Sequence, residues 1–183
     1  MNSRAKDLSI YLVLTYMATL TKLVADGALF EIEPDLDPGA QPFRYLYAVP
    51  GFRRFLDEVP SLESAWNIEE TPAEQLDDLL AEFLGTEPFA VRWRFGPLFP
   101  PRGKPWPGVW ELKTADLRIF GWFPRRNCFI AVNGCHAAKV KQIHGLYGAF
   151  RDEVVRVRNA LPIDEPYVTG EDYHDVISLL YFP

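Results

Sequence analysis

The stretch that reads GVWELKTADLRIFGWFPRRNCFIAVNG, residues 108–134, constrains the fold of this chain more than any other. It contains three runs rich in aromatic and β-branched residues, and two short polar segments, 114–116 and 124–127, separate them. Apolar runs broken by turn-forming residues are typical of consecutive antiparallel strands. We therefore predict a three-stranded meander with strands over residues 109–113, 117–123 and 128–132.

Helical patterns surround this meander. Thr71 suits an N-cap, Pro72 suits the first helical position, and Glu74 completes a capping box. An amphipathic helix is therefore predicted over residues 73–84. Apolar residues at helical spacing predict three further helices, over residues 7–28, 52–59 and 149–161.

Two other segments alternate between apolar and polar residues and predict strands over 43–49 and 89–95. In the second strand the two faces would hold Arg92 and Arg94 on one side and Val91, Trp93 and Phe95 on the other. Residues 133–148 are polar and are predicted to be irregular. These patterns predict an α+β fold with an antiparallel sheet of four or five strands, with helices 52–84 on one side and helix 149–161 beside it.

Charge is distributed unevenly along the chain, whose net charge is −6. Residues 1–88 hold 6 Lys and Arg against 16 Asp and Glu, residues 89–161 hold 13 against 4, and residues 162–183 hold none against 5. We interpret residues 1–42 as an N-terminal helical extension and linker, residues 43–161 as the main domain, and the rest as an acidic tail whose apolar end docks. Attraction between opposite charges predicts that one flank lies against the domain and covers part of its basic surface. The alternative is that the flanks wrap the opposite side as scaffold.

Several common function classes find no support in the sequence. It contains no serine in a nucleophile elbow, no phosphate loop and no dinucleotide fingerprint, and its three histidines lack metal-ligand spacing. Cys128 and Cys135 are not part of a Cys-x-x-Cys pair, which favours free thiols in a reducing cytoplasm. The longest apolar stretch, residues 10–20, falls short of the roughly 20 residues that span a bilayer. We therefore expect a cytoplasmic protein that uses no membrane, metal ion or cofactor.

Cationic side chains are concentrated on the predicted strands, close to aromatic residues. Guanidinium groups bind phosphate oxygens in bidentate fashion, and aromatic rings stack on unpaired bases. The cluster therefore favours a nucleic-acid ligand over a merely solvated sheet face. We predict that six of these cations form one contiguous positive face: Arg92, Arg94, Lys113, Arg118, Arg125 and Arg126.

The segment VWELKTADLRIFGWFPRRNCFIAVNGCH resembles the RelE/ParE/HigB toxin superfamily, in particular its phage-derived RelE-like branch. In that branch a strand reading roughly W-E-L-R is followed by an R-[IV]-[FY] strand and by a third strand that usually ends in L-x-G-F. The similar stretches here are Trp110-Glu111-Leu112-Lys113, Leu117-Arg118-Ile119-Phe120 and Val132-Asn133-Gly134-Cys135. The order of the predicted elements is also similar, so the resemblance covers about residues 43–161.

The resemblance implies a toxin of a type II toxin–antitoxin pair, with an antitoxin as its protein partner. Such a toxin is a metal-independent, ribosome-dependent mRNA endonuclease whose cations hold the scissile phosphate while the ribose 2′-hydroxyl attacks. By position, Lys113 and Arg118 match the catalytic cations, and His136 is the nearby candidate for proton transfer. The cations expected to bind nucleic acid around them are Arg92, Arg94, Arg125, Arg126, Lys139 and Lys141.

Two features differ from the family pattern. Ala137 and Ala138 stand where the family usually has a pair of lysines, and residues 1–42 and 162–183 have no counterpart in the compact toxins. Two alternatives therefore stay open. The first is a catalytically inactive RelE-fold protein of phage or mobile-element origin that binds nucleic acid or a protein, and the second is a ParE-like topoisomerase inhibitor.

Overall fold

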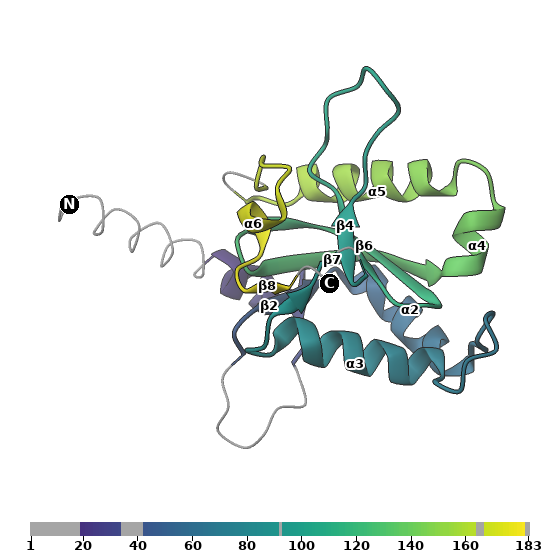
Figure 1. The fold of residues 1–183 in the computed structure, drawn as a ribbon. Coiled ribbons are helices and arrows are strands. Elements are labelled where there is room, and N and C mark those ends of the chain that lie inside the picture. The colour runs from purple at the N-terminus through teal and green to yellow at the C-terminus, as the bar shows by residue number, and fades with distance from the viewer. Residues whose placement is uncertain (1–18, 34–41, 92, 164–166, 182–183) are drawn as a thin grey trace, which may run out of the picture.

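A six-stranded sheet between two layers of helices forms the body of the molecule (Figure 1). The structure, a computed structural model, describes residues 19–33, 42–91, 93–163 and 167–181. The sheet has the strand order β1-β2-β7-β6-β5-β4. The predicted α+β class is confirmed.

The predicted meander is also confirmed and forms the centre of the sheet. Its strands pair antiparallel in chain order and are β5 (Trp110–Lys113), β6 (Leu117–Arg125) and β7 (Cys128–His136). The third strand is longer than predicted, because residues 133–136 continue the ladder with β6 up to the pair of His136 with Leu117.

The segment after the meander is more regular than its polar sequence suggests. The prediction that residues 133–148 are irregular is wrong, because the strand runs on to 136 and two helices follow. The side chain of His136 accepts a hydrogen bond from the backbone N–H of Ala138 and so caps the first helix. Gly145, with a φ of 82°, separates the two. The helices are α4 (Ala137–Gln142) and α5 (Leu146–Ala160).

The outer strands make the sheet mixed rather than antiparallel as predicted. They are β1 (Phe30–Glu31), β2 (Tyr45–Ala48) and β4 (Phe95–Pro97). β2 runs parallel to β7, whereas the other pairings in this sheet are antiparallel. A parallel pairing needs a long crossover, and the helical segment that follows β2 begins it.

The predicted single strand over residues 89–95 is wrong. Phe89 and Ala90 form β3 of a separate two-stranded sheet, and the chain then turns, since the N–H of Arg94 bonds to the C=O of Ala90 at 3.2 Å. The turn breaks the expected alternation: Val91 is buried, but Trp93 is 73% exposed. Arg92 lies outside the described residues.

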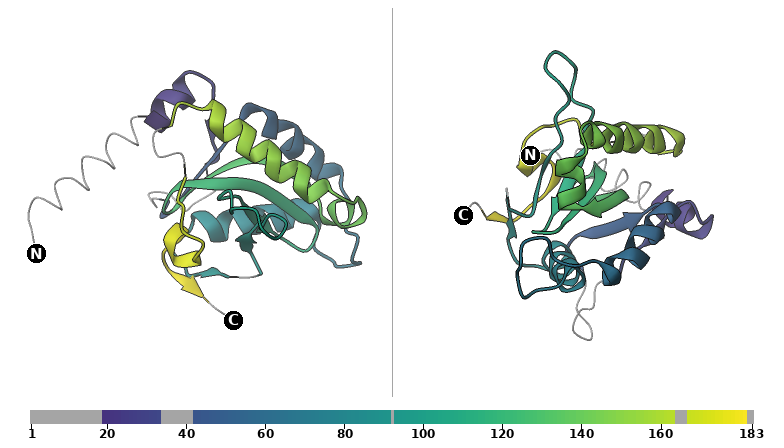
Figure 2. Two further views of the ribbon diagram at one scale, coloured as in Figure 1. Left: turned by 90° about the horizontal axis from the view of Figure 1, so that it is seen from above. Right: turned by 90° about the vertical axis from the view of Figure 1, so that its right-hand side faces the viewer.

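Helices cover both faces of the main sheet (Figure 2). One face packs against η1 (Pro50–Phe52), α2 (Arg53–Glu58), η2 (Val59–Ser61) and α3 (Pro72–Leu84). The predicted capping box of α3 is confirmed, with the N–H of Thr71 donating to Glu74 Oε2 at 2.7 Å. Phe83 of α3 packs against Phe123 and Phe129 of the sheet. The opposite face packs against α5, where Phe150 stacks on Phe120.

The described parts of both flanks pack onto the domain. The predicted helix over residues 7–28 begins outside the described residues, but residues 19–25 are helical, and Leu20 and Leu23 are buried on the α5 side. At the other end, α6 (Tyr173–Val176) and β8 (Leu180–Tyr181) follow the last long helix, and β8 pairs with β3. Among the described residues, no helix is long and apolar enough to cross a membrane.

Candidate functional site

A cleft lined by cations and tryptophans lies at the turn between β5 and β6. Its volume is about 560 Å³, within the range of about 300–1,000 Å³ typical of ligand sites. We call it the basic cleft and define it by Trp66, Trp93, Arg94, Lys113, Thr114, Ala115, Arg118 and Lys141. It therefore gathers four of the cations that the sequence singled out.

Strand register brings Lys113 and Arg118 together. They are direct partners on β5 and β6, and directly opposite side chains on an antiparallel pair share a face, with Cβ atoms about 5 Å apart. Two like charges in this position destabilise a sheet unless an anion balances them. Glu111, two residues before Lys113, lies on the same face of β5.

Glu111 forms the negative centre of this cluster. Its Oε2 atom lies 3.9 Å from Nε of Arg118, and both side chains are largely buried. Neither of these two atoms has a hydrogen-bond partner among the described residues. Burial raises the pKa of Glu111, although neighbouring cations oppose the rise, and burial lowers the pKa of Lys113. A carboxyl group and an amine whose pKa values move towards each other are suited to exchanging protons with a ligand.

Backbone carbonyl groups fix the orientation of Arg118. Its Nη1 donates to the C=O of Thr114 at 2.6 Å and to the C=O of Leu117 at 2.7 Å. Tyr147 of α5 also belongs to this group: burial and the charge of Glu111 raise its pKa, while Arg118 acts in the opposite direction. The guanidinium group is thus held in place before any ligand arrives.

A buried hydrogen-bond network centred on Asp116 anchors the β5–β6 turn. The carboxylate of Asp116 accepts hydrogen bonds from Gln75 Nε2 at 2.8 Å and from the N–H of Ala65 at 3.0 Å, and its own N–H donates to Gln75 Oε1. Burial alone would raise the pKa of Asp116, but these hydrogen bonds and the nearby His136 lower it overall. The network ties the turn to α3 and to the loop before it.

The rim of the basic cleft combines exposed rings with cations. Trp66 is 50% exposed, and its Nε1 donates to the C=O of Ala115 at 3.1 Å. Nζ of Lys141, from α4, lies 4.7 Å from the centre of the Trp66 ring. Arg94 is tied to both carboxylate oxygens of Glu82, at 2.8 and 2.6 Å.

Three of the predicted nucleic-acid-binding residues lie outside the basic cleft: Arg125, Arg126 and Lys139. The position of the two arginines makes the predicted contiguous positive face wrong. Arg125 and Arg126 follow Arg118 by seven and eight residues, at the other end of β6, which at about 3.3 Å per residue is more than 20 Å away. They line a separate groove with tail residues that include Tyr167 and Asp175. The predicted strand over residues 117–123 already implied this separation, since it places Arg118 at its start and Arg125 and Arg126 beyond its end.

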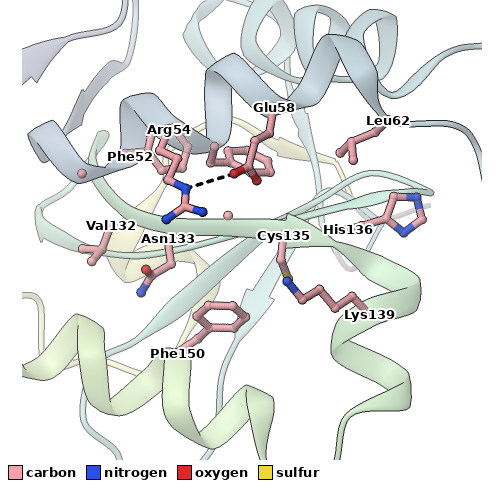
Figure 3. Close-up of a pocket in the computed structure, with 13 residues that line it drawn as sticks. Phe52, Arg54, Glu58, Leu62, Val132, Asn133, Cys135, His136, Lys139 and Phe150 are labelled. Atoms are coloured by element: carbon pink, nitrogen blue, oxygen red, sulfur yellow. Dashed lines mark hydrogen bonds and ion pairs between the residues drawn. The ribbon is translucent and has the colours of Figure 1, made fainter.

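His136 and Lys139 line a third cavity, of about 410 Å³, between β7, α2 and α5 (Figure 3). His136 pairs with Leu117, the neighbour of Arg118, so alternation directs its side chain to the opposite face. Both of its ring nitrogens are engaged: Nδ1 accepts from Ala138, and Nε2 lies 3.1 Å from the C=O of Glu63. The structure therefore does not bring His136 into the basic cleft.

Sequence reasoning missed two residues: Trp66, which lines the basic cleft, and Glu111, which lies beside Arg118 but does not itself line the cleft. Glu111 had a detectable signal, since it is an acidic residue at an i−2 position from Lys113 on a predicted strand. Trp66 had none, because it lies in a loop and reaches the cleft only through the folding of that loop onto Ala115.

The chain was compared with models of protein families, with curated proteins and with solved structures. None matches. Within the described ranges, no group of three or more His, Cys, Asp or Glu side chains could hold a metal ion.

Proposed function

We propose that this chain is a RelE-like, metal-independent endoribonuclease and that the basic cleft is its active site. The observation that carries the proposal is the cluster of Glu111, Lys113 and Arg118, in which a buried carboxylate of raised pKa lies beside two cations. Lys113 and Arg118 also line a cleft that is open to a ligand. Perturbed pKa values next to an open cleft are typical of acid–base sites.

The cluster supports a complete cleavage step. The 2′-oxygen of one nucleotide attacks the adjacent phosphorus, and the bond from phosphorus to the next 5′-oxygen breaks, which leaves a 2′,3′-cyclic phosphate and a 5′-hydroxyl. The ionised Glu111 accepts the proton of the 2′-hydroxyl, and the ammonium group of Lys113 donates one to the leaving 5′-oxygen. Arg118 binds the phosphate oxygens and offsets the charge that develops on them.

The proposed cellular setting rests on the resemblance of residues 109–136. In that setting mRNA on the ribosome is the substrate, and an antitoxin encoded beside the chain binds it and holds its activity in check. A reading frame for a small DNA-binding protein next to this one would support the pairing. Co-expression with that protein should then relieve growth arrest.

The test is the double variant Lys113→Ala/Arg118→Ala, compared with Arg126→Ala, which removes one positive charge outside the cleft. Growth arrest on expression, and RNA cleavage in a purified translation mixture, should be lost in the double variant and kept in Arg126→Ala. Circular dichroism melts establish that both variants are folded. Full cleavage by the folded double variant would contradict the proposal.

A second candidate is a non-catalytic RNA-binding protein. It is favoured because two of the cations in the cleft are already bonded to other groups of the protein. Nε and Nη2 of Arg94 are already paired with Glu82, and Nη1 of Arg118 already donates to two carbonyl groups. Such a protein binds RNA and leaves it intact. The substitution Glu111→Gln separates the two candidates, since it removes cleavage by an enzyme but leaves the affinity of a binding protein nearly unchanged.

A further inference from the structure

We propose that Trp66 and Trp93 are stacking surfaces for unpaired nucleobases, so that the basic cleft selects single-stranded RNA over duplex. The inference deepens the proposed function and rests on it for the identity of the ligand as RNA. The two tryptophans lie at the rim of the cleft, whereas the proposed reaction takes place at Lys113 and Arg118 on the sheet.

The exposure of these two rings is the first observation. Large apolar side chains normally bury most of their surface, and leaving a tryptophan in water forfeits the stabilisation that its burial would give. Trp66 is 50% exposed and Trp93 is 73% exposed, yet the other described tryptophans are buried or half-buried. Both exposed rings line the same cleft.

Trp66 is also held ready for a ligand. Its Nε1–H bond to the C=O of Ala115 fixes the ring against the β5–β6 turn, while half of its surface stays open. A ring fixed before binding loses little conformational freedom when a base stacks on it. Nζ of Lys141 lies over one face of the ring, 4.7 Å from its centre, so a base would stack on the other face with a positive charge close by.

The arrangement of charge and rings indicates which form of nucleic acid fits. The cations Lys113 and Arg118 lie on the sheet beside Glu111, and the two indoles lie in loops beside them. A strand bound in this way presents its phosphates to the sheet and its bases to the rings. Only an unpaired strand can do so, because a duplex keeps its bases inside and presents only its backbone.

Binding of RNA in which every ribose is 2′-O-methylated tests the inference without cleavage. The measurement compares the affinity of the full chain for a single-stranded oligonucleotide with its affinity for a hairpin of equal length. The variants are Trp66→Leu, Trp93→Leu and Trp66→Phe. Phe99→Leu is the matched control, because Phe99 is an exposed ring, 56% accessible, outside the cleft.

We expect each leucine variant to bind the single strand about 5- to 150-fold more weakly, the range associated with loss of one base–aromatic stack. Trp66→Phe should keep much of the affinity that Trp66→Leu loses. Phe99→Leu should bind the single strand as tightly as the unchanged chain does. The hairpin should bind more weakly than the single strand, and the leucine variants should reduce that preference.

Equal affinity of the folded leucine variants for the single strand, or equal binding of hairpin and single strand by the unchanged chain, would overturn the stacking inference and leave the proposed nuclease intact. Absence of binding to either RNA at low salt would overturn both. Circular dichroism of each variant keeps a loss of folding from being read as a loss of stacking.

Discussion

Cations lie at both turns of the central meander, yet the surroundings of the two turns differ. At the β5–β6 turn, Asp116 anchors the backbone from one side, and the basic cleft stays open on the other. At the β6–β7 turn, the C-terminal tail occupies the space: Asn127 Nδ2 donates to Ser178 Oγ at 2.6 Å, and the N–H of Ser178 donates to Asn127 Oδ1 at 2.8 Å. One turn is therefore available to a ligand, and the other is a seam between two parts of the same chain.

This difference shows that cations alone do not define a binding site. Arg125 lies 5.4 Å from the ring centre of Tyr45 and borders the groove that the tail helps to form. Lys113 and Arg118 instead share their face with a buried carboxylate and an open cleft. The tail does lie against the domain, as its apolar end predicted, but among the described residues it lines the groove at Arg125 and not the basic cleft.

The largest expected effect is the loss of RNA cleavage in the variant Glu111→Gln. The control is Glu171→Gln, which makes the same change at an exposed position of the tail. Loss of a positioned general base lowers the rate by about 100- to 10,000-fold, so the first variant should lose most activity and the second none. The measurement is single-turnover cleavage of RNA in the translation mixture. Equal cleavage rates for the two variants would contradict the view that the β5–β6 turn, and not the tail-covered β6–β7 turn, is the reactive one.

Asp116→Ala should destabilise the fold by about 3 kcal/mol, because the N–H of Ala65 loses its acceptor and the buried amide nitrogen of Gln75 keeps only the C=O of Glu70. Urea denaturation followed by circular dichroism gives this free energy of unfolding. A change in the free energy of unfolding below about 0.5 kcal/mol, the size typical of surface substitutions, would show that the Asp116 network does not stabilise the β5–β6 turn.

The same carboxylate predicts a dependence of stability on pH. The pKa of Asp116 is lower in the folded chain than its ordinary value of 3.8, so its stabilisation is present above that value and is lost as the pH falls through the folded pKa. Melting temperatures of the unchanged chain should therefore fall more steeply with acidification than those of Asp116→Asn. Parallel curves for the two proteins would contradict the assignment.

Asn127→Ala should have a smaller effect, about 2 kcal/mol, through loss of its two hydrogen bonds to Ser178. Asn127 also has a φ of 61°, which asparagine tolerates better than alanine. RNA cleavage by the folded variant should be unchanged. A folded Asn127→Ala protein with impaired cleavage would mean that the seam and the cleft are coupled.

The same contrast explains how far the sequence could be interpreted. The meander and the capped helix α3 were predictable, because turn residues and the capping box at Thr71 are local signals. The register of the β5–β6 hairpin, which pairs Lys113 with Arg118, depends on the geometry of its turn. The split at 91–94, the parallel β2–β7 pairing and the docking of Ser178 at Asn127 depend on contacts between distant segments, and no local pattern encodes them.

The salt dependence of RNA binding tests the central claim most directly, namely that RNA phosphates contact the basic cleft at one end of β6 and not the tail-covered groove at the other end. Each phosphate contact on a single strand contributes about 0.7 to the slope of log affinity against log salt concentration. Arg118→Ala should lower that slope by about 0.7 relative to the unchanged chain, and Arg126→Ala should leave it unchanged. A lower slope for Arg126→Ala together with an unchanged slope for Arg118→Ala would contradict the account.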